Sequence, residues 1–561
     1  MTMTSRDTRD PFLLEVINSA FETIADNLAV TLMRSAYSEI VRESLDFSTA
    51  LCDWRGRTIA QGVCTPLHLG GFQDSMEHLI RDAGDDLAPG DIFIFNDPYL
   101  ASGQHLPDVY IVKPIYYKGR IEGWATTLAH QSDVGGIVAG SNALGASELF
   151  QEGLRLPFVK FYVAGKRNET LARIIHANSR TPHLVMGDLE AQVAACHNAE
   201  RELIELLDRY GVDTFRYYVD ILHDYAEQLT RDALRAMPDG TYRFTDHIDG
   251  LGDKPVPIPF CVTLKIAGDE AFVSWDGTSP QVEGGLNCTF SFTKSCVYAA
   301  LRSVLQSDIP NCEGFYRPIH VEAPLGSILN PNFPAPVGAR GITGYRIIDC
   351  MFGALAQAVP ERVPADGSGG STLPTISGWQ NGKRFVFCET LMGTTGGSAA
   401  ADGQGGIPHI GANQSNVPVE VIESNYPIRV EKYCYVPDTG GAGEFRGGLA
   451  LRREYRVLCD QAELNMRADK IAFPPYGLAG GNTGSSPRLQ IRRNGHSIRV
   501  SALPLQPIKL QKNDLVVVQM PGGGGFGSPE RRDRERIRAD LVEGLISAEH
   551  AKNMYGYEES V

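Results

Sequence analysis

The stretch Asp46-Phe-Ser-Thr-Ala-Leu-Cys-Asp53 leads into Trp54-Arg-Gly-Arg57 and then into Thr58-Ile-Ala-Gln61. Two short β-prone runs joined by a turn that contains glycine are typical of a β-hairpin. Two further runs, Asp91-Ile-Phe-Ile-Phe95 and Val109-Tyr-Ile-Val112, are apolar and bounded by turn residues, so they predict buried strands. Together these segments predict a sheet in the amino-terminal part of the chain.

Helical patterns lie on both sides of this predicted sheet. Between Pro11 and Ser38, apolar residues recur at three- and four-residue steps, and proline suits the first turn of a helix. Two longer amphipathic segments, about 188–210 and 212–236, are separated by Gly211, which predicts two consecutive helices.

After a turn at 237–240 the pattern becomes mainly β. Strands are predicted at 240–249, 256–266 and 270–275, and again within 427–520. Glycine and proline concentrate in 323–372, and glycine in 393–416, which predicts long loops on a scaffold. Two short helices are predicted at the end of the chain, and Ser547 is placed to cap the second.

Composition and charge exclude several classes of protein. The chain has 561 residues and a formal net charge of -15, with no basic stripe, so nucleic acid and anionic membranes are not the expected partners. No apolar run approaches the roughly 20 residues of a membrane-spanning helix, and no signal peptide is visible. The 11 cysteines include no CxxC pair, which argues against a disulfide framework or a thiolate zinc site and favours a reducing, cytoplasmic location.

The densest set of chemically useful side chains lies between residues 43 and 133. His105-Leu-Pro-Asp108 places an imidazole and a carboxylate at the entry to a strand, His130 ends the next strand, and Asp46 opens the hairpin. Mixed imidazole and carboxylate donors suit Zn²⁺, Mn²⁺ or Fe²⁺, and a position left to water would supply a nucleophile. The spacing alone is suggestive, because such sets also arise by chance and aspartates commonly serve turns.

Other motifs extend along almost the whole chain. Together they resemble the hydantoinase B/oxoprolinase family: Arg42-Glu-Ser-Leu-Asp-Phe-Ser48, Asn96-Asp-Pro-Tyr99, Ala129-His-Gln-Ser-Asp-Val-Gly-Gly136, Gly344-Tyr-Arg346, Asn416-Val-Pro-Val-Glu420, Gly440–Gly448 and Gly522–Pro529. The family includes N-methylhydantoinase, ATP-dependent lactamases, and metal-carrying subunits of acetone and acetophenone carboxylases. The resemblance implies that Asp46, His105, Asp108 and His130 are the ligands of one divalent transition metal, with zinc favoured and manganese or iron as alternatives. Leu45 departs from the pattern, since a polar residue is expected before Asp-Phe-Ser.

The resemblance also implies a division of labour between two subunits. A hydantoinase A-type partner would hydrolyse ATP and phosphorylate a small cyclic amide such as a hydantoin, oxoproline or lactam. This chain would then hydrolyse the activated species within a hetero-oligomer such as (AB)2. Two alternatives stay open: a subunit of an ATP-dependent ketone carboxylase, for which the chain is short, and a non-catalytic scaffold for the ATPase subunit.

Further residues are weaker candidates. Glu43, Asp133 and Glu152 could serve as a general base or hold an imidazole, and Asp97 lies equally close in sequence. Arg340, Tyr345 and Arg346 fall in the glycine-rich centre, where a guanidinium could clamp a substrate carboxylate or phosphate. His68 and His78 are interpreted as structural. No Walker A motif is present, so we expect that this chain does not bind ATP by itself.

These observations combine into one fold prediction. The predicted class is α+β, multidomain and with mixed sheets, in which a metal-binding α/β region precedes a β-rich, Gly/Pro-rich carboxy-terminal half. A chain of this length exceeds one ordinary hydrophobic core. The predicted domains are a metal-binding domain at 1–237, a central β-rich domain at 238–345, a glycine-rich β-containing domain at 346–520 and a helical tail at 521–561.

Overall fold

A seven-stranded antiparallel sheet forms the amino-terminal part of the molecule. The computed structural model describes residues 10–62, 65–101, 104–305, 308–368, 370 and 372–558; Cys64 lies outside these residues. The strand order is β2-β1-β5-β4-β3-β6-β7. The strands are β1 (Phe47–Asp53), β2 (Thr58–Gln61), β3 (Ile92–Phe95), β4 (Asp108–Tyr117), β5 (Arg120–His130), β6 (Val159–Val163) and β7 (Lys166–Arg167).

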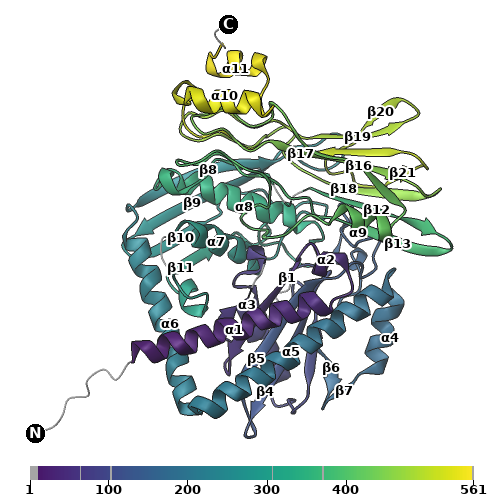
Figure 1. Cartoon of the computed structure of the whole chain (residues 1–561). Coiled ribbons are helices and arrows are strands. Elements are labelled where there is room, and N and C mark those ends of the chain that lie inside the picture. The colour runs from purple at the N-terminus through teal and green to yellow at the C-terminus, as the bar shows by residue number, and fades with distance from the viewer. Residues whose placement is uncertain are drawn as a thin grey trace, which may run out of the picture.

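Helices pack against this sheet. α1 and α5 run side by side across it, with α6 at the edge (Figure 1). The helices of this region are α1 (Pro11–Ser35), α2 (Glu39–Arg42), α3 (Gly71–Ala83), α4 (Glu169–Asn178), α5 (Pro182–Tyr210) and α6 (Val212–Arg235). The predicted helix after Pro11, the two helices separated by Gly211 and the first hairpin are all confirmed.

A second, mixed sheet follows, in the order β11-β10-β9-β8, and its β10–β11 pair is parallel. It contains β8 (Gly240–Ile248), β9 (Ile258–Ala267), β10 (Glu270–Ser274) and β11 (Ile319–Glu322), and it is accompanied by α7 (Phe290–Val304) and α8 (Arg340–Leu355). All 16 residues of α8 are buried, and Figure 1 shows it in the middle of the molecule.

The position of α8 corrects the prediction of one long loop across 323–372. Its glycines were interpreted as signs of loop structure, but two of them permit close packing. A Cβ on Gly344 would lie 2.7 Å from the Phe292 ring, and one on Gly353 would lie 2.4 Å from the Phe244 ring. Tertiary packing therefore outweighs the poor helix propensity of glycine here.

The carboxy-terminal half is mainly β, as predicted, and contains two larger sheets and one small one. Their strands are β12 (Leu373–Gln380), β13 (Lys383–Cys388), β14 (Gly393–Thr394), β15 (Gly405–Ile407), β16 (Ile428–Val436), β17 (Ala450–Val457), β18 (Ala462–Arg467), β19 (Arg488–Arg493), β20 (His496–Arg499), β21 (Ile508–Leu510) and β22 (Leu515–Gln519). One short helix, α9 (Val419–Asn425), lies among them. The α+β, multidomain class with mixed sheets is thus confirmed, although the amino-terminal sheet is antiparallel.

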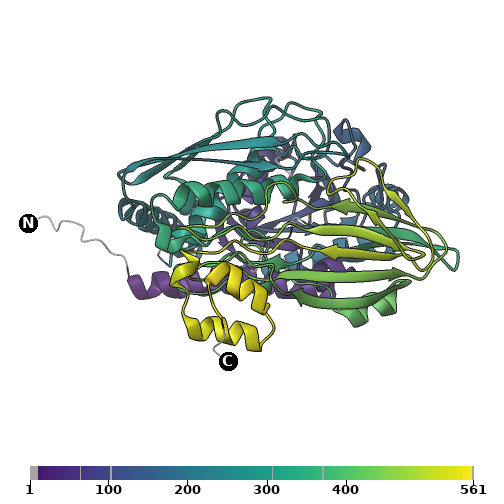
Figure 2. The same ribbon diagram turned by 90° about the horizontal axis from the view of Figure 1, so that it is seen from above.

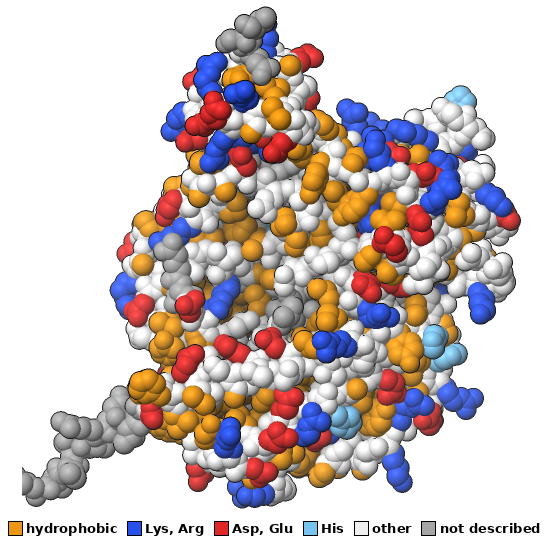
Figure 3. Space-filling model, viewed as in Figure 1, with side chains coloured by type: hydrophobic (Ala, Val, Ile, Leu, Met, Phe, Trp, Pro, Cys, Tyr) orange, Lys and Arg blue, Asp and Glu red, His pale blue; other side chains and the backbone are white. Residues whose placement is uncertain are grey.

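The chain ends in two short helices, α10 (Arg534–Val542) and α11 (Ala548–Tyr555). Ser547 caps the second, since its hydroxyl accepts from the His550 amide at 3.1 Å. Both helices project from the body (Figure 1), beside the strands of the carboxy-terminal half when seen from above (Figure 2). Acidic and basic side chains are interspersed on the face drawn in Figure 3. Among the described helices, none is long and apolar enough to cross a membrane.

Candidate metal centre

Neighbouring strands bring the predicted ligands to one edge of the amino-terminal sheet. Asp108 opens β4 and pairs in register with His130 at the end of β5. The His130 amide donates to the carbonyl of Asp46, which directly precedes β1, at 3.0 Å. His105 lies one turn before β4, and its carbonyl accepts from the Asp108 amide at 3.0 Å. Residues far apart in sequence therefore meet because β1, β5 and β4 are adjacent.

Three of the predicted ligands form a compact set. One potential ligand atom from each of His105, Asp108 and His130 lies within 4.8 Å of the other two. The His105 and His130 rings have centroids 5.1 Å apart. Three buried atoms of the set lack a hydrogen-bond partner among the described residues: His105 Nε2, Asp108 Oδ1 and His130 Nδ1. Unpaired buried polar atoms are costly, so a shared ligand is expected between them.

The tautomer of His105 makes this expectation specific to a cation. His105 Nδ1 lies 2.8 Å from the Gly338 carbonyl, which can only accept, so Nδ1 carries the hydrogen. In the neutral ring, Nε2 then presents a lone pair to Asp108 Oδ1 at 3.3 Å. Two acceptors at that distance repel each other unless a proton or a metal ion lies between them. A metal-binding histidine commonly uses this second-nitrogen contact to a carbonyl.

Electrostatics keep the donors in the protonation states that a metal needs. Burial lowers the pKa of His130 to about 4 and also lowers the pKa of His105, so both imidazoles are neutral near pH 7. Burial alone would raise the pKa of Asp108, but Arg340 and His105 hold it well below its usual range. The set therefore offers two neutral imidazoles and one carboxylate.

A loop that leads into α8 supports these donors. Its residue Gly338 accepts from His105 and donates its own amide to Glu152 Oε1 at 2.6 Å. Two residues later, Arg340 pairs with Asp108 and lies 3.4 Å from Gln104 Oε1. Glu152 is fully buried, and burial raises its pKa to about 8. Glu152 thus contacts the loop that holds His105, and within the described part of the chain it makes no hydrogen bond or ion pair with the three donors.

Asp46 lies beside the three-residue set but is not a member of it. Its carboxyl interacts with His130 and Gln414, and burial raises its pKa. Leu45 directly before it has a φ of 60°, a left-handed conformation that a leucine adopts at a cost.

The other carboxylate candidates lie elsewhere. Asp133 accepts from the amides of Gly135, Gly140 and Arg180 and pairs with the Arg180 guanidinium, so it holds the turn after β5. Asp97 accepts from two amides of its own loop and pairs with Arg155. Glu43 is partly exposed, 3.8 Å from Arg42.

The three substrate-binding candidates lie on α8 and not in a loop. Arg340 lies beside the set formed by His105, Asp108 and His130, where it pairs with Asp108. Tyr345 is buried, with its ring edge-on to His409 at 5.0 Å. Arg346 pairs with Asp246 and, at 2.5 Å, with Asp469. Its guanidinium is therefore occupied by carboxylates of the protein.

The structure adds two neighbours that the sequence did not single out as functional. His68, interpreted as structural, is buried with Nε2 4.0 Å from Asp108 Oδ2 and Nδ1 2.8 Å from the Ser48 hydroxyl. Arg467, the last residue of β18, lies against the first turn of α8. Neither residue stands in a recognisable motif, and only the packing of distant segments reveals them.

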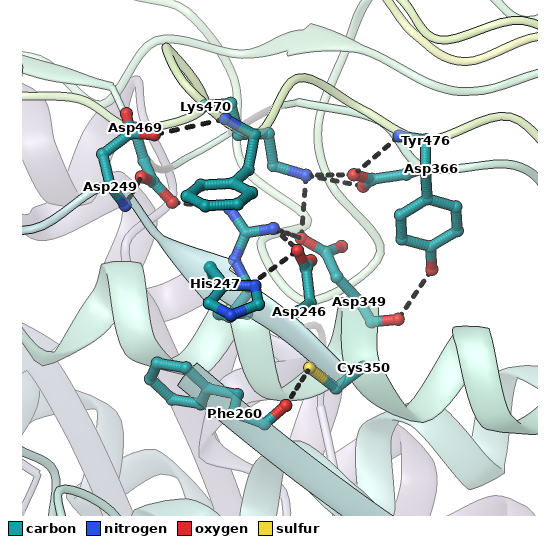
Figure 4. A network of polar contacts seen from close by, with 12 residues as sticks. Asp246, His247, Asp249, Phe260, Asp349, Cys350, Asp366, Asp469, Lys470 and Tyr476 are labelled. Carbon is teal, nitrogen blue, oxygen red and sulfur yellow. Dashed lines mark hydrogen bonds and ion pairs between the residues drawn. The ribbon is translucent and has the colours of Figure 1, made fainter. Parts of the chain in front are cut away.

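A second acidic cluster lies further along α8 (Figure 4). Asp246, Asp349 and Asp366 also offer oxygens within 4.8 Å of one another. The Lys470 ammonium already lies among them, 2.6 Å from both oxygens of Asp366 and 2.9 Å from Asp349 Oδ2, and it also donates to the Gly367 carbonyl at 2.9 Å. Arg346 supplies a second internal cation. Since its cations are built in, this cluster is a structural network.

Comparison with known proteins places this geometry in a family. The family model for hydantoinase B/oxoprolinase matches residues 10–529. The chain is 34% identical to the B component of a putative D-/L-hydantoinase from Pseudomonas sp. (strain NS671), over 98% of this chain and 95% of that protein. The chain belongs to the hydantoinase B/oxoprolinase family.

Two solved structures superpose closely on this chain. The crystal structure of an ATP-dependent caprolactamase from Pseudomonas jessenii superposes with a TM-score of 0.91 at 32% identity, covering 99% of this chain and 97% of that one. A nucleotide-free acetone carboxylase structure superposes with a TM-score of 0.90 at 18% identity, covering 98% and 80% of the two chains, which shows a shared fold. The family resemblance found in the sequence motifs is thus confirmed.

Proposed function

We propose that this chain is the metal-binding subunit of an ATP-dependent amidohydrolase that opens a hydantoin, oxoproline or lactam-like ring. A partner of the hydantoinase A type would phosphorylate the ring amide, and the two would act within a hetero-oligomer such as (AB)2. Similarity to a hydantoinase component and to an ATP-dependent caprolactamase supports the substrate class.

The single observation that carries the proposal is the repulsive contact between His105 Nε2 and Asp108 Oδ1, which a cation resolves. His105, Asp108 and His130 would hold the ion, with Asp46 as the fourth ligand. Two imidazoles with carboxylates favour Zn²⁺, with Mn²⁺ or Fe²⁺ as alternatives. When bound, such an ion polarises a carbonyl oxygen and lowers the pKa of water.

The chain's own residues would prepare the centre for this chemistry. Gly338 fixes the His105 tautomer, and Arg340 keeps Asp108 ionised and oriented. Phosphorylation of the amide oxygen by the partner removes the resonance that makes an amide a poor electrophile. Water then adds to the imidate carbon, and the C–N bond breaks as the ring nitrogen takes a proton. The resulting acyl phosphate reacts with a second water to give the carboxylate and inorganic phosphate.

Reconstitution with the partner tests this function. We expect product from a panel of hydantoin, 5-oxoproline and caprolactam to require ATP, the partner and one bound metal per chain, without bicarbonate. Oxygen from labelled water should enter the new carboxylate. His105→Ala should lose both the metal and the activity, whereas Asp91→Asn, at the opposite end of β3, should keep both.

The two alternatives give different results in the same experiment. A carboxylase would need bicarbonate and would place its carbon in the product. A scaffold would keep full activity after His105→Ala or Asp46→Asn. Either outcome would overturn the proposed function.

A further inference from the structure

Arg467 differs from every other buried arginine among the described residues. Six arginines are less than a tenth exposed: Arg340, Arg346, Arg446, Arg453, Arg467 and Arg532. Five of them pair with a carboxylate of the protein. Arg467 is 6% exposed and has no carboxylate oxygen within 4.0 Å in the described part of the chain; its one hydrogen bond there is to Asn142 Oδ1 at 3.2 Å. Its Nε has no hydrogen-bond partner among the described atoms, a feature that it shares with Arg340, Arg346, Arg453 and Arg532.

An unpaired guanidinium in the protein interior is unfavourable, because burial removes its hydration without supplying an opposite charge. Burial lowers the pKa of Arg467, and the nearby Arg340 lowers it further, while Tyr345 and Asp46 oppose this change. Arg467 therefore lies at a position where the protein itself leaves a positive charge uncompensated.

The direction of the side chain adds to this imbalance. A Cβ on Gly341 would lie 3.6 Å from both terminal nitrogens of Arg467, so the guanidinium faces the first turn of α8. Among the described residues, no side chain caps that turn. The amino-terminal end of a helix carries a partial positive charge, which is the usual setting for a bound phosphate. At the start of α8 the amides of Arg340 and Ile342 already donate to backbone carbonyls, at 3.0 and 3.2 Å, and the Gly341 amide has no such partner among the described residues. Two positive features face each other here, and an anion between them would stabilise both.

The charge of the whole centre fits a dianion. As ligands of the divalent ion, Asp46 and Asp108 would be ionised and contribute two negative charges, and Arg340 and Arg467 contribute two positive charges. Glu152, with a pKa raised to about 8, is mostly neutral near pH 7. The divalent ion of the proposed function would bring the total to two positive charges. A phosphate monoester carries about -1.5 to -2 at that pH.

We propose that Arg467 and the amino-terminal turn of α8 form the phosphate-binding part of this centre. The site would hold the phosphate group of the activated amide during hydrolysis and the inorganic phosphate that is released at the end. This inference rests on the proposed function, in which the substrate arrives phosphorylated. A fork-shaped guanidinium on the phosphate would also hold the adjacent imidate carbon on the side of Asp46 and Arg340, whose charges act on Arg467.

Binding of inorganic phosphate to the isolated chain tests the inference without partner or substrate. Calorimetry and thermal unfolding would be run with phosphate against chloride at equal ionic strength, with and without added Zn²⁺. We expect one phosphate per chain for the natural sequence. Arg467→Met should weaken phosphate binding at least tenfold, and Arg467→Lys, which keeps the charge but not the fork, should weaken it less.

Arg532→Met is the matched control, because Arg532 is equally buried but pairs with Asp402 and Asp540 near the carboxy terminus. It should bind phosphate normally and lose stability, since two carboxylates lose their partner. Arg467→Met should be at least as stable as the natural chain in phosphate-free buffer, because it removes an unpaired charge.

Two results would overturn the inference: no phosphate binding by the natural chain, or the same phosphate affinity in Arg467→Met as in the natural chain. These outcomes are separable from failure of the proposed function, which is judged by product formation with the partner. An enzyme that opens the ring while Arg467→Met binds phosphate normally would keep the function and discard the phosphate site.

Discussion

Two buried clusters of carboxylates each contact a residue of α8, and they differ in where their positive charge comes from. Around Asp349 and Asp366, Lys470 and Arg346 supply the cations, and the Lys470 ammonium contacts carboxylate and carbonyl oxygens as a bound ion would (Figure 4). At the other cluster, Arg340 satisfies one oxygen of Asp108 and leaves the other facing an imidazole lone pair. Proximity of carboxylates therefore does not define a metal site; unsatisfied donor atoms do.

The largest expected effect follows from removing a built-in cation. Lys470→Met should destabilise the chain by about 3–5 kcal/mol, the usual cost of leaving buried carboxylates unpaired. Urea unfolding of the metal-free chain would measure it, with Lys512→Met as the control, since Lys512 and its partner Asp460 are largely exposed. In the same assay, His105→Ala should cost far less.

Equal stability of Lys470→Met and the natural chain would contradict the comparison, because the second cluster would then need no internal cation. A metal bound at that cluster in the natural chain would also contradict the comparison, because Lys470 and Arg346 would then not be sufficient as its cations.

Some features of these two clusters could be predicted from the sequence and others could not. The difference is whether a short stretch of sequence encodes the feature. Strand patterns and spaced motifs predicted Asp46, His105, Asp108 and His130 as a set. Three of the four meet in the structure, because β pairing converts the end of one strand and the start of the next into neighbours. Local patterns gave a wrong prediction at α8, where a loop was expected. Gly344 and Gly353 there allow close packing against aromatic rings.

Other features depend on contacts between distant segments, which no local pattern encodes. The isolation of Arg467 is visible only after β18 is placed against α8. The involvement of Arg346 with Asp246 and Asp469 likewise joins three separate segments. The sequence was enough to predict the family and to single out the three residues that the structure groups, but not which arginines already pair with carboxylates of the protein.

A smaller effect concerns acidity at the metal centre. Since the folded pKa of His130 is about 4, below the roughly 6.5 of an unfolded histidine, protons compete with a metal only as pH falls toward 4. We expect the metal to survive dialysis at about pH 5.5, as measured by elemental analysis.

The same shift has a consequence for the metal-free chain. The unfolded state binds more protons than the folded state between about pH 4 and 6.5, so the stability from this group is complete above that window and is lost as pH falls through it. His223 provides the control: it is buried with a pKa lowered to about 3 and lies on α6, so His223→Gln should reduce the pH dependence of stability without changing metal retention. Loss of metal between pH 7 and 6 would contradict this view of the centre.

The smallest expected effect concerns Glu152, which contacts the candidate metal centre only through the backbone. Glu152 accepts from the Gly338 amide, and Gly338 in turn accepts from His105, so this carboxyl positions a ligand through the backbone. Glu152→Ala should lower metal affinity by about 10-fold, at the lower end of the range for groups that orient a metal ligand. Glu152→Gln keeps the accepting oxygen and should restore affinity to within a few-fold, which a role that depends on negative charge would not allow.

Asp91→Ala is the control. It removes a carboxyl that also accepts backbone amides, at the far end of β3, and it should reduce stability without changing the metal affinity. Metal titration of the three variants would decide the matter: if Glu152→Gln were as weak as Glu152→Ala, the charge of Glu152 rather than its hold on Gly338 would be what the centre needs.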